Sequence, residues 1–173
     1  MIICGAGAAG LMAALVLKRK THNNVSILIL EHKDKPGKKL LATGNGRCNF
    51  ANDCIDEKSF RGEHPEFGYN VVEKFDKKAM FDLFYDEGVL TTSINGYYYP
   101  RSLQAQTVLN MFLKNDKNID KCIHCNENVT DISKKGSSYR IKTDKGEYEA
   151  AYVVMACGGK AFSVHGSDGS GYD

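Results

Sequence analysis

The 173-residue sequence lacks a long hydrophobic run, an excess of one charge and a basic leader. Its longest useful apolar runs, 11–17 and 27–30, are far shorter than the roughly 20 residues that a membrane-spanning helix needs. The 23 lysines and arginines are nearly balanced by 21 aspartates and glutamates, whereas polyanion-binding domains carry a clustered basic excess. We therefore expect a cytoplasmic protein that binds neither a membrane nor nucleic acid. The sequence does not reveal the oligomeric state.

Cysteine is too scarce for a disulfide scaffold, with six in 173 residues against the ~8–10% typical of such chains. Cys122 and Cys125 form one CxxC pair, and no second pair follows at zinc-ribbon spacing. A four-thiolate site that also recruits Cys48 and Cys54 is the alternative. Buried or half-buried reduced thiols in a strand are favoured, so we expect no metal.

Glycine is the one residue in excess, at 17 of 173 residues against a usual share of about 7%. Eleven of these glycines fall in three short windows, 5–10, 37–46 and 158–171. Glycine adopts positive φ angles and lets a backbone come close to a ligand, so the clusters suggest ligand-holding turns.

The hydrophobic pattern predicts an α/β domain. An apolar strand at 1–4, a helix over 11–17 closed by basic residues 18–20, and a buried strand at 25–30 form a βαβ unit. Such a unit crosses over with a right hand. A long polar loop follows to residue 52, with a helical turn at 38–42.

The rest of the chain alternates short helices with short strands. We expect a helix from the cap Asp76 to about Glu87, with Tyr85 on its apolar face. A hairpin should turn at Asn95-Gly96, and Ser102 should cap a helix that buries Leu103. The final strands are expected at 128–133, 138–143 and 147–150, as an antiparallel meander, and at 152–156.

Gly5-Ala6-Gly7-Ala8-Ala9-Gly10 is a GxGxxG motif that follows a strand and opens a helix. Glu31 lies 21 residues after Gly10, at the tip of the second strand, which completes a dinucleotide-binding fingerprint. Gly5 makes the turn, Gly7 admits the pyrophosphate, and Gly10 lets helix and strand pack closely. Glu31 accepts hydrogen bonds from the adenosine ribose and repels a 2′-phosphate, which disfavours NADP. The alternative is a structural turn that binds nothing.

The choice between FAD and NAD depends on the rest of the chain. An NAD half-domain usually continues with regular αβ units, but here a polar loop follows the second strand and a β-meander replaces a crossover helix. This arrangement resembles the flavoproteins with two dinucleotide-binding domains.

The resemblance is most specific in the loop GKKLLATGNGRCN at 37–49. With GAGAAGLMAA at 5–14, Tyr99-Pro100-Arg101-Ser102 and the stretch 156–160 (ACGGK), it resembles the BaiN-like, or aminoacetone-oxidase-like, family of bacterial FAD-dependent oxidoreductases. The resemblance covers essentially all 173 residues. It implies a Rossmann-like FAD-binding domain, a parallel sheet with a βαβ N-terminus and a three-stranded antiparallel β-meander as crossover.

The resemblance also implies a role for each matching position. Gly5, Gly7, Ala8, Ala9 and Gly10 would hold the pyrophosphate, and Glu31 the ribose. Val129 would meet adenine through its backbone, and Ala156, Cys157 and Gly158 would line a second turn along the cofactor. The ribityl and flavin half would be wrapped by Lys38, Lys39, Thr43, Gly44, Asn45, Gly46, Arg47, Cys48 and Asn49.

The residues of the loop support this reading independently. Lys38, Lys39 and Arg47 supply cationic donors for a doubly charged pyrophosphate, although a solvated surface loop is the alternative for the lysines. We expect Arg47 to face the ligand. Cys48 and Cys157 are not spaced as CxxC, so small packing residues are favoured over redox-active thiols.

These observations predict a flavin-dependent oxidoreductase in which FAD exchanges hydride with NAD(P)H and with a small carbonyl, enone or amine. No catalytic residue can be nominated. We expect residues 1–173 to form an incomplete FAD-binding domain, without the family's substrate domain and C-terminal flavin-contacting segment. The alternatives are a truncated, non-catalytic flavin- or nucleotide-binding module and an NAD-dependent dehydrogenase. A flavin-dependent RNA-modifying enzyme shares the fold, but the balanced charge offers no RNA footprint.

Overall fold

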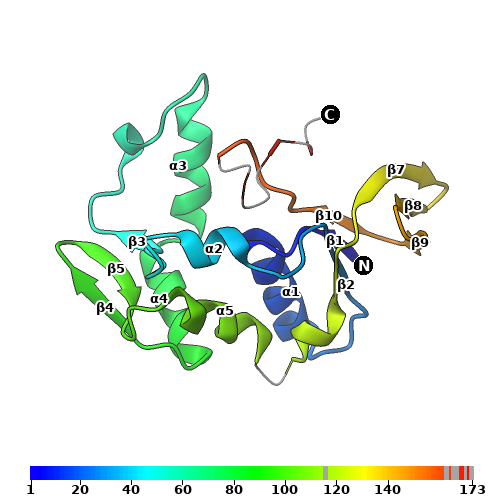
Figure 1. The fold of residues 1–173 in the computed structure, drawn as a ribbon. Coiled ribbons are helices and arrows are strands. Elements are labelled where there is room, and N and C mark those ends of the chain that lie inside the picture. Colours follow the sequence, from blue (N-terminus) through cyan, green and yellow to red (C-terminus); the bar gives the residue numbers. More distant parts are fainter. Residues whose placement is uncertain (115–116, 162–163, 165–167, 170, 172–173) are drawn as a thin grey trace. The chain divides into compact units, whose positions relative to one another are not determined.

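The computed structural model describes residues 1–114, 117–161, 164, 168–169 and 171. These residues divide into two units, one comprising Met1–Leu41 and Phe112–Asp173 and the other Ala42–Met111. Figure 1 shows the elements in chain order. None of the helices in the described ranges is both long and apolar enough to cross a membrane.

A parallel four-stranded sheet forms the centre of the first unit, with strand order β10-β1-β2-β6 (Figure 1). Its strands are β1 (Ile2–Cys4), β2 (Leu28–Glu31), β6 (Ile123–Cys125) and β10 (Val153–Met155). Ile3 pairs with Ile29 on one side and Val154 on the other. Because Ile3 and Ile29 are fully buried, this register places the most apolar positions at the core of the unit.

Helix α1 (Ala8–Lys20) connects β1 to β2 and confirms the predicted βαβ unit. It buries Leu11, Ala14 and Leu15 against the sheet, and Lys18, Arg19 and Lys20 occupy its last turn, where cations suit the helix dipole. The second strand is shorter than predicted at its start. Pairing with β1 begins at Leu28, which is opposite Ile2, and ends at Leu30, and the strand itself continues to Glu31.

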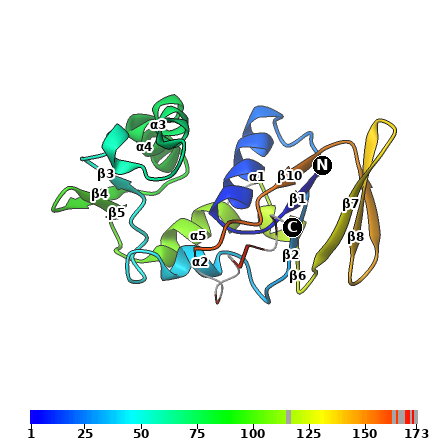
Figure 2. The same cartoon turned by 90° about the horizontal axis from the view of Figure 1, so that it is seen from above.

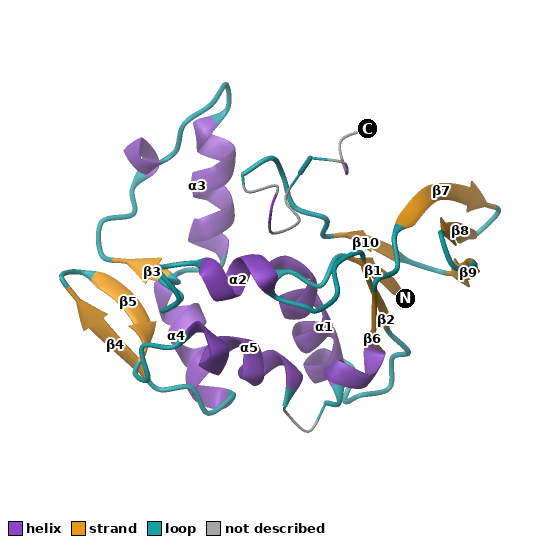
Figure 3. Ribbon diagram, viewed as in Figure 1, coloured by secondary structure: helices purple, strands orange, loops and turns teal. Residues whose placement is uncertain are grey.

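The predicted meander is present as β7 (Val129–Lys135), β8 (Ser138–Thr143) and β9 (Glu147–Ala150), paired antiparallel in that order (Figure 3). A register shift interrupts the β7–β8 ladder between Val129 and Asp131. Buried Ile141 and Ala150 belong to the same apolar cluster as Ile2 and Leu30. The meander is therefore anchored to the parallel sheet by its apolar face. Figure 2 shows β7 and β8 beside the strands of that sheet.

A 3-10 helix, η2 (Ile119–Cys122), is the element of the first unit that was not predicted. It leads into β6, which pairs parallel with β2 and confirms, for Cys125, the strand expected at the CxxC pair. The CxxC cysteines therefore lie at the end of η2 and the end of β6, where both thiols are half-buried and free. No cluster of three potential metal ligands occurs among the residues that the structure describes.

The second unit combines a small antiparallel sheet, ordered β3-β5-β4, with helices. The rings of Phe50 and Phe84 pack in a tilted arrangement at 4.5 Å between centroids, and those of Phe81 and Tyr98 at 4.8 Å, so aromatic contacts contribute to the packing of this unit. Its elements, together with the two helices at its boundaries, are α2 (Lys38–Ala42), β3 (Ala51–Asn52), η1 (Glu57–Ser59), α3 (Pro65–Lys74), α4 (Lys77–Asp86), β4 (Thr91–Ile94), β5 (Tyr97–Pro100) and α5 (Ala105–Leu113).

The helical turn at 38–42, the Asp76 cap and the Asn95-Gly96 hairpin are confirmed. The helix capped by Ser102 was predicted too long. Ser102 Oγ accepts from the backbone N–H of Gln104 at 3.3 Å, and the helix begins only at Ala105, because Leu103 has a left-handed φ of +53°. Leu103 is consequently 37% exposed rather than buried. Tyr85, expected on an apolar face, is 73% exposed, whereas Leu83 and Phe84 are buried.

Candidate dinucleotide site

The glycine-rich turn lies at the carboxyl end of β1, and two of its glycines are required by close packing. A Cβ at Gly10 would lie 1.9 Å from the carbonyl oxygen of Gly5. A Cβ at Gly5, whose φ is +107°, would lie 2.4 Å from the carbonyl oxygen of Ala156. The turn is thus packed against α1 on one side and against the segment after β10 on the other.

Gly7 is different, because among the residues that the structure describes no atom beyond its chain neighbours lies within 4 Å of the position that its Cβ would take. It is the N-cap of α1, has an ordinary φ of −79°, and no side chain caps the helix. Ala8 and Ala9, the first two helical residues, are exposed. The helix end therefore has open space at the Cβ position of Gly7, exposed residues in its first turn and a positive dipole end, which fit an approaching pyrophosphate.

Glu31 is buried at the end of β2 and is bonded to the same turn. Its Oε2 accepts from the backbone N–H of Ala6 at 2.8 Å, and its Oε1 accepts from that of Lys33 at 2.9 Å. His32 Nδ1 lies 3.2 Å from Oε1. A carboxylate offers about four lone-pair sites, so Glu31 retains capacity for ribose hydroxyls beyond these contacts.

The second predicted turn is continuous with the first. Ala156 donates from its backbone N–H to the carbonyl of Cys4 at 2.8 Å, and Gly158 has a positive φ of +78°. Burial, and secondarily the neighbouring Cys157 thiol, raises the pKa of Cys4 to about 11. The Gly5–Gly10 turn, Glu31 and the turn at 156–158 therefore meet at the carboxyl edge of the sheet, where such folds bind ligands.

The loop at 43–49 lies in the second unit and is held in an unusual coil. Gly44, Asn45, Gly46 and Cys48 all have left-handed φ angles, between +56° and +80°. The carbonyl of Thr43 accepts from the backbone N–H groups of Gly46 at 3.1 Å and Cys48 at 2.9 Å. A Cβ at Gly44 would lie 2.7 Å from the backbone nitrogen of Asn49, so glycine is needed there. The sequence GNGRCN is thus a defined turn rather than an irregular loop.

The cations of this region have local partners. Lys38, on α2, forms an ion pair with Asp34. Arg47 donates from Nε to the carbonyl of Gly44 at 3.2 Å, and its guanidinium lies 5.1 Å from the centroid of the Tyr99 ring. Burial raises the pKa of Cys48, against a smaller lowering effect of its hydrogen bond with Thr43, so this thiol is not activated.

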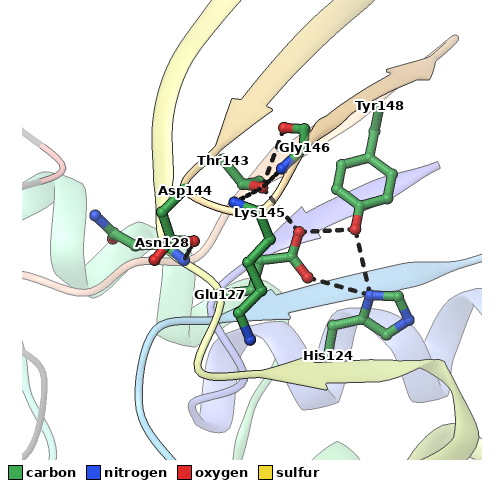
Figure 4. A network of polar contacts seen from close by, with 8 residues as sticks. All are labelled: His124, Glu127, Asn128, Thr143, Asp144, Lys145, Gly146 and Tyr148. Atoms are coloured by element: carbon green, nitrogen blue, oxygen red, sulfur yellow. Dashed lines mark hydrogen bonds and ion pairs between the residues drawn. The ribbon is translucent and has the colours of Figure 1, made fainter.

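A polar network around the buried Glu127, at the base of the meander, was not predicted (Figure 4). Glu127 Oε1 accepts from Tyr148 Oη at 2.7 Å and from Thr143 Oγ1 at 2.8 Å, and Glu127 Oε2 lies 3.2 Å from His124 Nδ1. Burial alone would raise the pKa of Glu127, but these hydrogen bonds outweigh it and lower the pKa. The only local sign was a glutamate in the break between two strands, between Asn126 and Asn128.

The predicted site residues are divided between the two units of the structure. Gly5 to Gly10, Glu31 and 156–158 lie together in the first unit, and Val129 opens β7 next to the Glu127 network. Residues 43–49 form their own turn in the second unit. A parallel sheet with a glycine turn after β1, an acidic residue at the end of β2 and a meander before β10 defines a Rossmann-like FAD-binding domain.

The chain belongs to the family of the HI0933-like protein Rossmann domain, which matches residues 1–173. This match confirms the resemblance to BaiN-like FAD-dependent oxidoreductases and favours FAD over the NAD-dehydrogenase alternative.

Among curated proteins, the chain is 39% identical over 170 residues to a 3-dehydro-bile acid delta(4,6)-reductase of Clostridium scindens, covering 98% of this chain and 41% of that protein. It is 23% identical to a ribosomal RNA dihydrouridine synthase of Escherichia coli, covering 99% of this chain and 42% of that protein. The chain thus spans about two fifths of the length of these relatives.

Solved structures with the same fold include cyclohexanone monooxygenase from Rhodococcus sp. Phi1 bound to NADP+ (TM-score 0.53, 19% identity, 91% of this chain and 25% of that chain). A steroid monooxygenase bound to NADP is similar at a TM-score of 0.52 and 17% identity, over 91% of this chain and 25% of that one. These likenesses concern the fold.

Proposed function

We propose that this chain holds FAD in a cytoplasmic flavin-dependent oxidoreductase that transfers hydride between NAD(P)H and a small organic substrate. The observation that carries the proposal is the contrast within the glycine turn: Gly5 and Gly10 are packed against backbone, whereas the space at Gly7 is open. Close packing accounts for the first two glycines but leaves the third unexplained, and an approaching pyrophosphate accounts for it.

The chain's own residues would bind and orient the cofactor. Backbone N–H groups at the start of α1 would hold the pyrophosphate, Glu31 would accept from the ribose, and the backbone of Val129 would contact adenine. The turn at 43–49, with Lys38 and Lys39, would surround the ribityl and flavin half, and residues 156–158 would line the second turn. Bound FAD supplies the hydride chemistry, and the protein contributes position and electrostatics.

The relatives narrow the substrate class. The relative at 39% identity is named a reductase of a 3-dehydro-bile acid, which favours a carbonyl or enone over an amine as the substrate. A second candidate is reduction of a base in RNA, because the relative at 23% identity is named a ribosomal RNA dihydrouridine synthase. We favour the small molecule because that identity is higher and because the chain has no basic excess.

The test compares two glycine substitutions in the full-length protein. Gly7→Val fills the space that the pyrophosphate would take, and Gly146→Val is the matched control, because Gly146 also has open space at its Cβ and no positive φ. We expect the wild type and Gly146→Val to copurify with FAD, seen by flavin absorbance, and Gly7→Val to be folded and colourless. Unaltered FAD affinity in Gly7→Val would contradict the site.

The wild-type holoprotein is then assayed for oxidation of NADH and NADPH with a set of enones and with ribosomal RNA. Turnover with an enone and none with RNA supports the favoured substrate class. The reverse pattern would support the second candidate.

A further inference from the structure

The Glu127 network joins two parts of the proposed adenosine site that are far apart in the sequence. The backbone N–H of Glu127 donates to the carbonyl of Glu31 at 2.9 Å. The side chain of Glu31 in turn contacts the glycine-rich turn, because its Oε2 accepts from the backbone N–H of Ala6. Glu127 is therefore one hydrogen bond from the residue proposed to hold the ribose, and two from the turn proposed to hold the pyrophosphate.

On its other side the network holds the start of the meander. Thr143, which donates to Glu127 Oε1, is the residue that pairs with Val129 across the β7–β8 ladder. Asn128 and Asp144 add a reciprocal pair, since Asn128 N–H donates to Asp144 Oδ1 at 2.9 Å and Asp144 N–H donates to the carbonyl of Asn128 at 3.0 Å. The backbone of Val129, proposed to meet adenine, is thus set by contacts that lead back to Glu127.

The meander does not need a buried carboxylate for its own packing, because Ile141 and Ala150 already bury its apolar face with Ile2 and Leu30. Glu127 is only 4% exposed, and a buried carboxylate is tolerated only when hydrogen bonds compensate its lost hydration. Three side chains from β6, β8 and β9 provide that compensation: His124, Thr143 and Tyr148 (Figure 4). Such a fully satisfied network fixes a single geometry.

We propose that Glu127 is a positioning residue for the adenosine half of the dinucleotide, acting through Glu31 on one side and through Thr143 and Val129 on the other. The inference rests on the proposed FAD site. Glu127 holds the β6–β7 connection against the end of β2, so that the ribose acceptor and the adenine-facing backbone keep a fixed separation.

The experiment measures the affinities of the full-length apoprotein for FAD and for ADP, which represents the adenosine half alone. Glu127→Ala removes the three side-chain contacts that Glu127 makes with His124, Thr143 and Tyr148, and it should weaken the binding of both ligands by a similar factor of about ten. Glu127→Gln should recover most of this affinity. Its amide oxygen still accepts from Tyr148 and Thr143, and its amide N–H₂ donates to a neutral His124.

Glu149→Ala is the matched control, because Glu149 is a carboxylate in the same meander that is bonded to Ser138 and Lys135 but not to the β6–β7 connection. It should change both affinities by less than about twofold. If Glu149→Ala weakens ADP binding as much as Glu127→Ala does, the loss of affinity reflects a general loss of meander structure, and the proposal is overturned.

Two further variants cover the case in which Glu127→Ala does not fold. Tyr148→Phe deletes its hydrogen bond to Glu127 and keeps the shape of the ring. Thr143→Val also deletes its hydrogen bond to Glu127, together with the contacts of Oγ1 with Lys145 and Gly146. Each variant should weaken ADP binding by a few-fold. ADP affinities equal to wild type in both would overturn the proposal. A wild type that binds neither FAD nor ADP would overturn the proposed function together with this inference. A wild type that binds both, with Glu127→Ala binding equally well, would overturn the inference alone.

Discussion

Glu31 Oε2 accepts a hydrogen bond from the backbone N–H of Ala6, 25 positions earlier, at 2.8 Å. Both residues are buried, and the bond connects the end of β2 to the middle of the glycine-rich turn. A residue that the dinucleotide fingerprint assigns to ligand binding therefore also holds the ligand-binding turn in place.

Replacing Glu31 should consequently cost stability as well as affinity. In Glu31→Ala the buried N–H of Ala6 loses its acceptor, which should lower the free energy of unfolding by about 1–3 kcal/mol. Glu31→Gln keeps one acceptor oxygen and should lie between this variant and the wild type. Urea denaturation followed by circular dichroism measures the difference. Glu147→Ala, which removes an exposed carboxylate 3.8 Å from Arg140, should change stability little, and an equal loss there would contradict the argument.

Gly10→Ala tests the close packing of α1 on the turn. Alanine in a helix interior normally stabilises by roughly 0.5–1 kcal/mol relative to glycine. Here the new Cβ would lie 1.9 Å from the carbonyl oxygen of Gly5, so helix and turn must separate, at a cost of about 1–3 kcal/mol or more. A thermal midpoint below that of the wild type would show that the close contact outweighs the helix propensity of alanine, and a higher midpoint would show the reverse. A Gly10→Ala protein as stable as the wild type would show that the turn relaxes freely.

The βαβ unit could be predicted because its signals are local. Apolar residues at strand and helix spacing, glycines at fixed offsets and a basic last turn all occur within about thirty residues, and the structure reproduces them in β1, α1 and β2. The same is true of the Asn95-Gly96 hairpin, where both turn residues have the positive φ angles that a type I′ turn requires.

The pairing of β6 with β2 and the Glu127 network could not be predicted because both depend on residues far away in the sequence. Ile123–Cys125 is too short for a periodic pattern and becomes a strand by pairing with β2, roughly ninety positions earlier. The partners of Glu127 at Thr143 and Tyr148 are 16 and 21 positions away. Likewise, the composition around Arg47 suggested a ligand-facing cation, but its contacts with Gly44 and Tyr99 arise from the folded turn.

Asp76 provides a test confined to the second unit. Its Oδ1 accepts from the backbone N–H of Ala79 at 2.8 Å and so caps α4. Asp76→Ala should lower the free energy of unfolding by about 1 kcal/mol, whereas Asp76→Asn keeps an acceptor and should be nearly neutral. Hydrogen exchange should be faster in the first turn of α4 for the alanine variant. Unchanged exchange at Ala79 would mean that the cap contributes nothing.

The raised pKa of Cys4 predicts a loss of stability at alkaline pH. The unfolded thiol ionises near its ordinary pKa of 9.0, whereas burial, aided by Cys157, raises the folded pKa to about 11. Between these values the unfolded state binds fewer protons, so the free energy of unfolding must fall as pH rises, by up to about 3 kcal/mol from this group. The contribution is fully present below pH 9.

Other groups with raised pKa values, among them Cys125 and Tyr148, also lower the free energy of unfolding as the pH rises. The contribution of Cys4 is therefore measured by comparing the wild type with a Cys4 variant. Cys4→Ala loses packing at every pH but has no thiol to ionise. The difference in unfolding free energy between wild type and Cys4→Ala should therefore shrink as the pH is raised from 9 to 11. A difference that stays constant over this range would show that Cys4 ionises alike in both states. Alkylation gives an independent check, because native protein at pH 8 should react at exposed Cys54 well before buried Cys4.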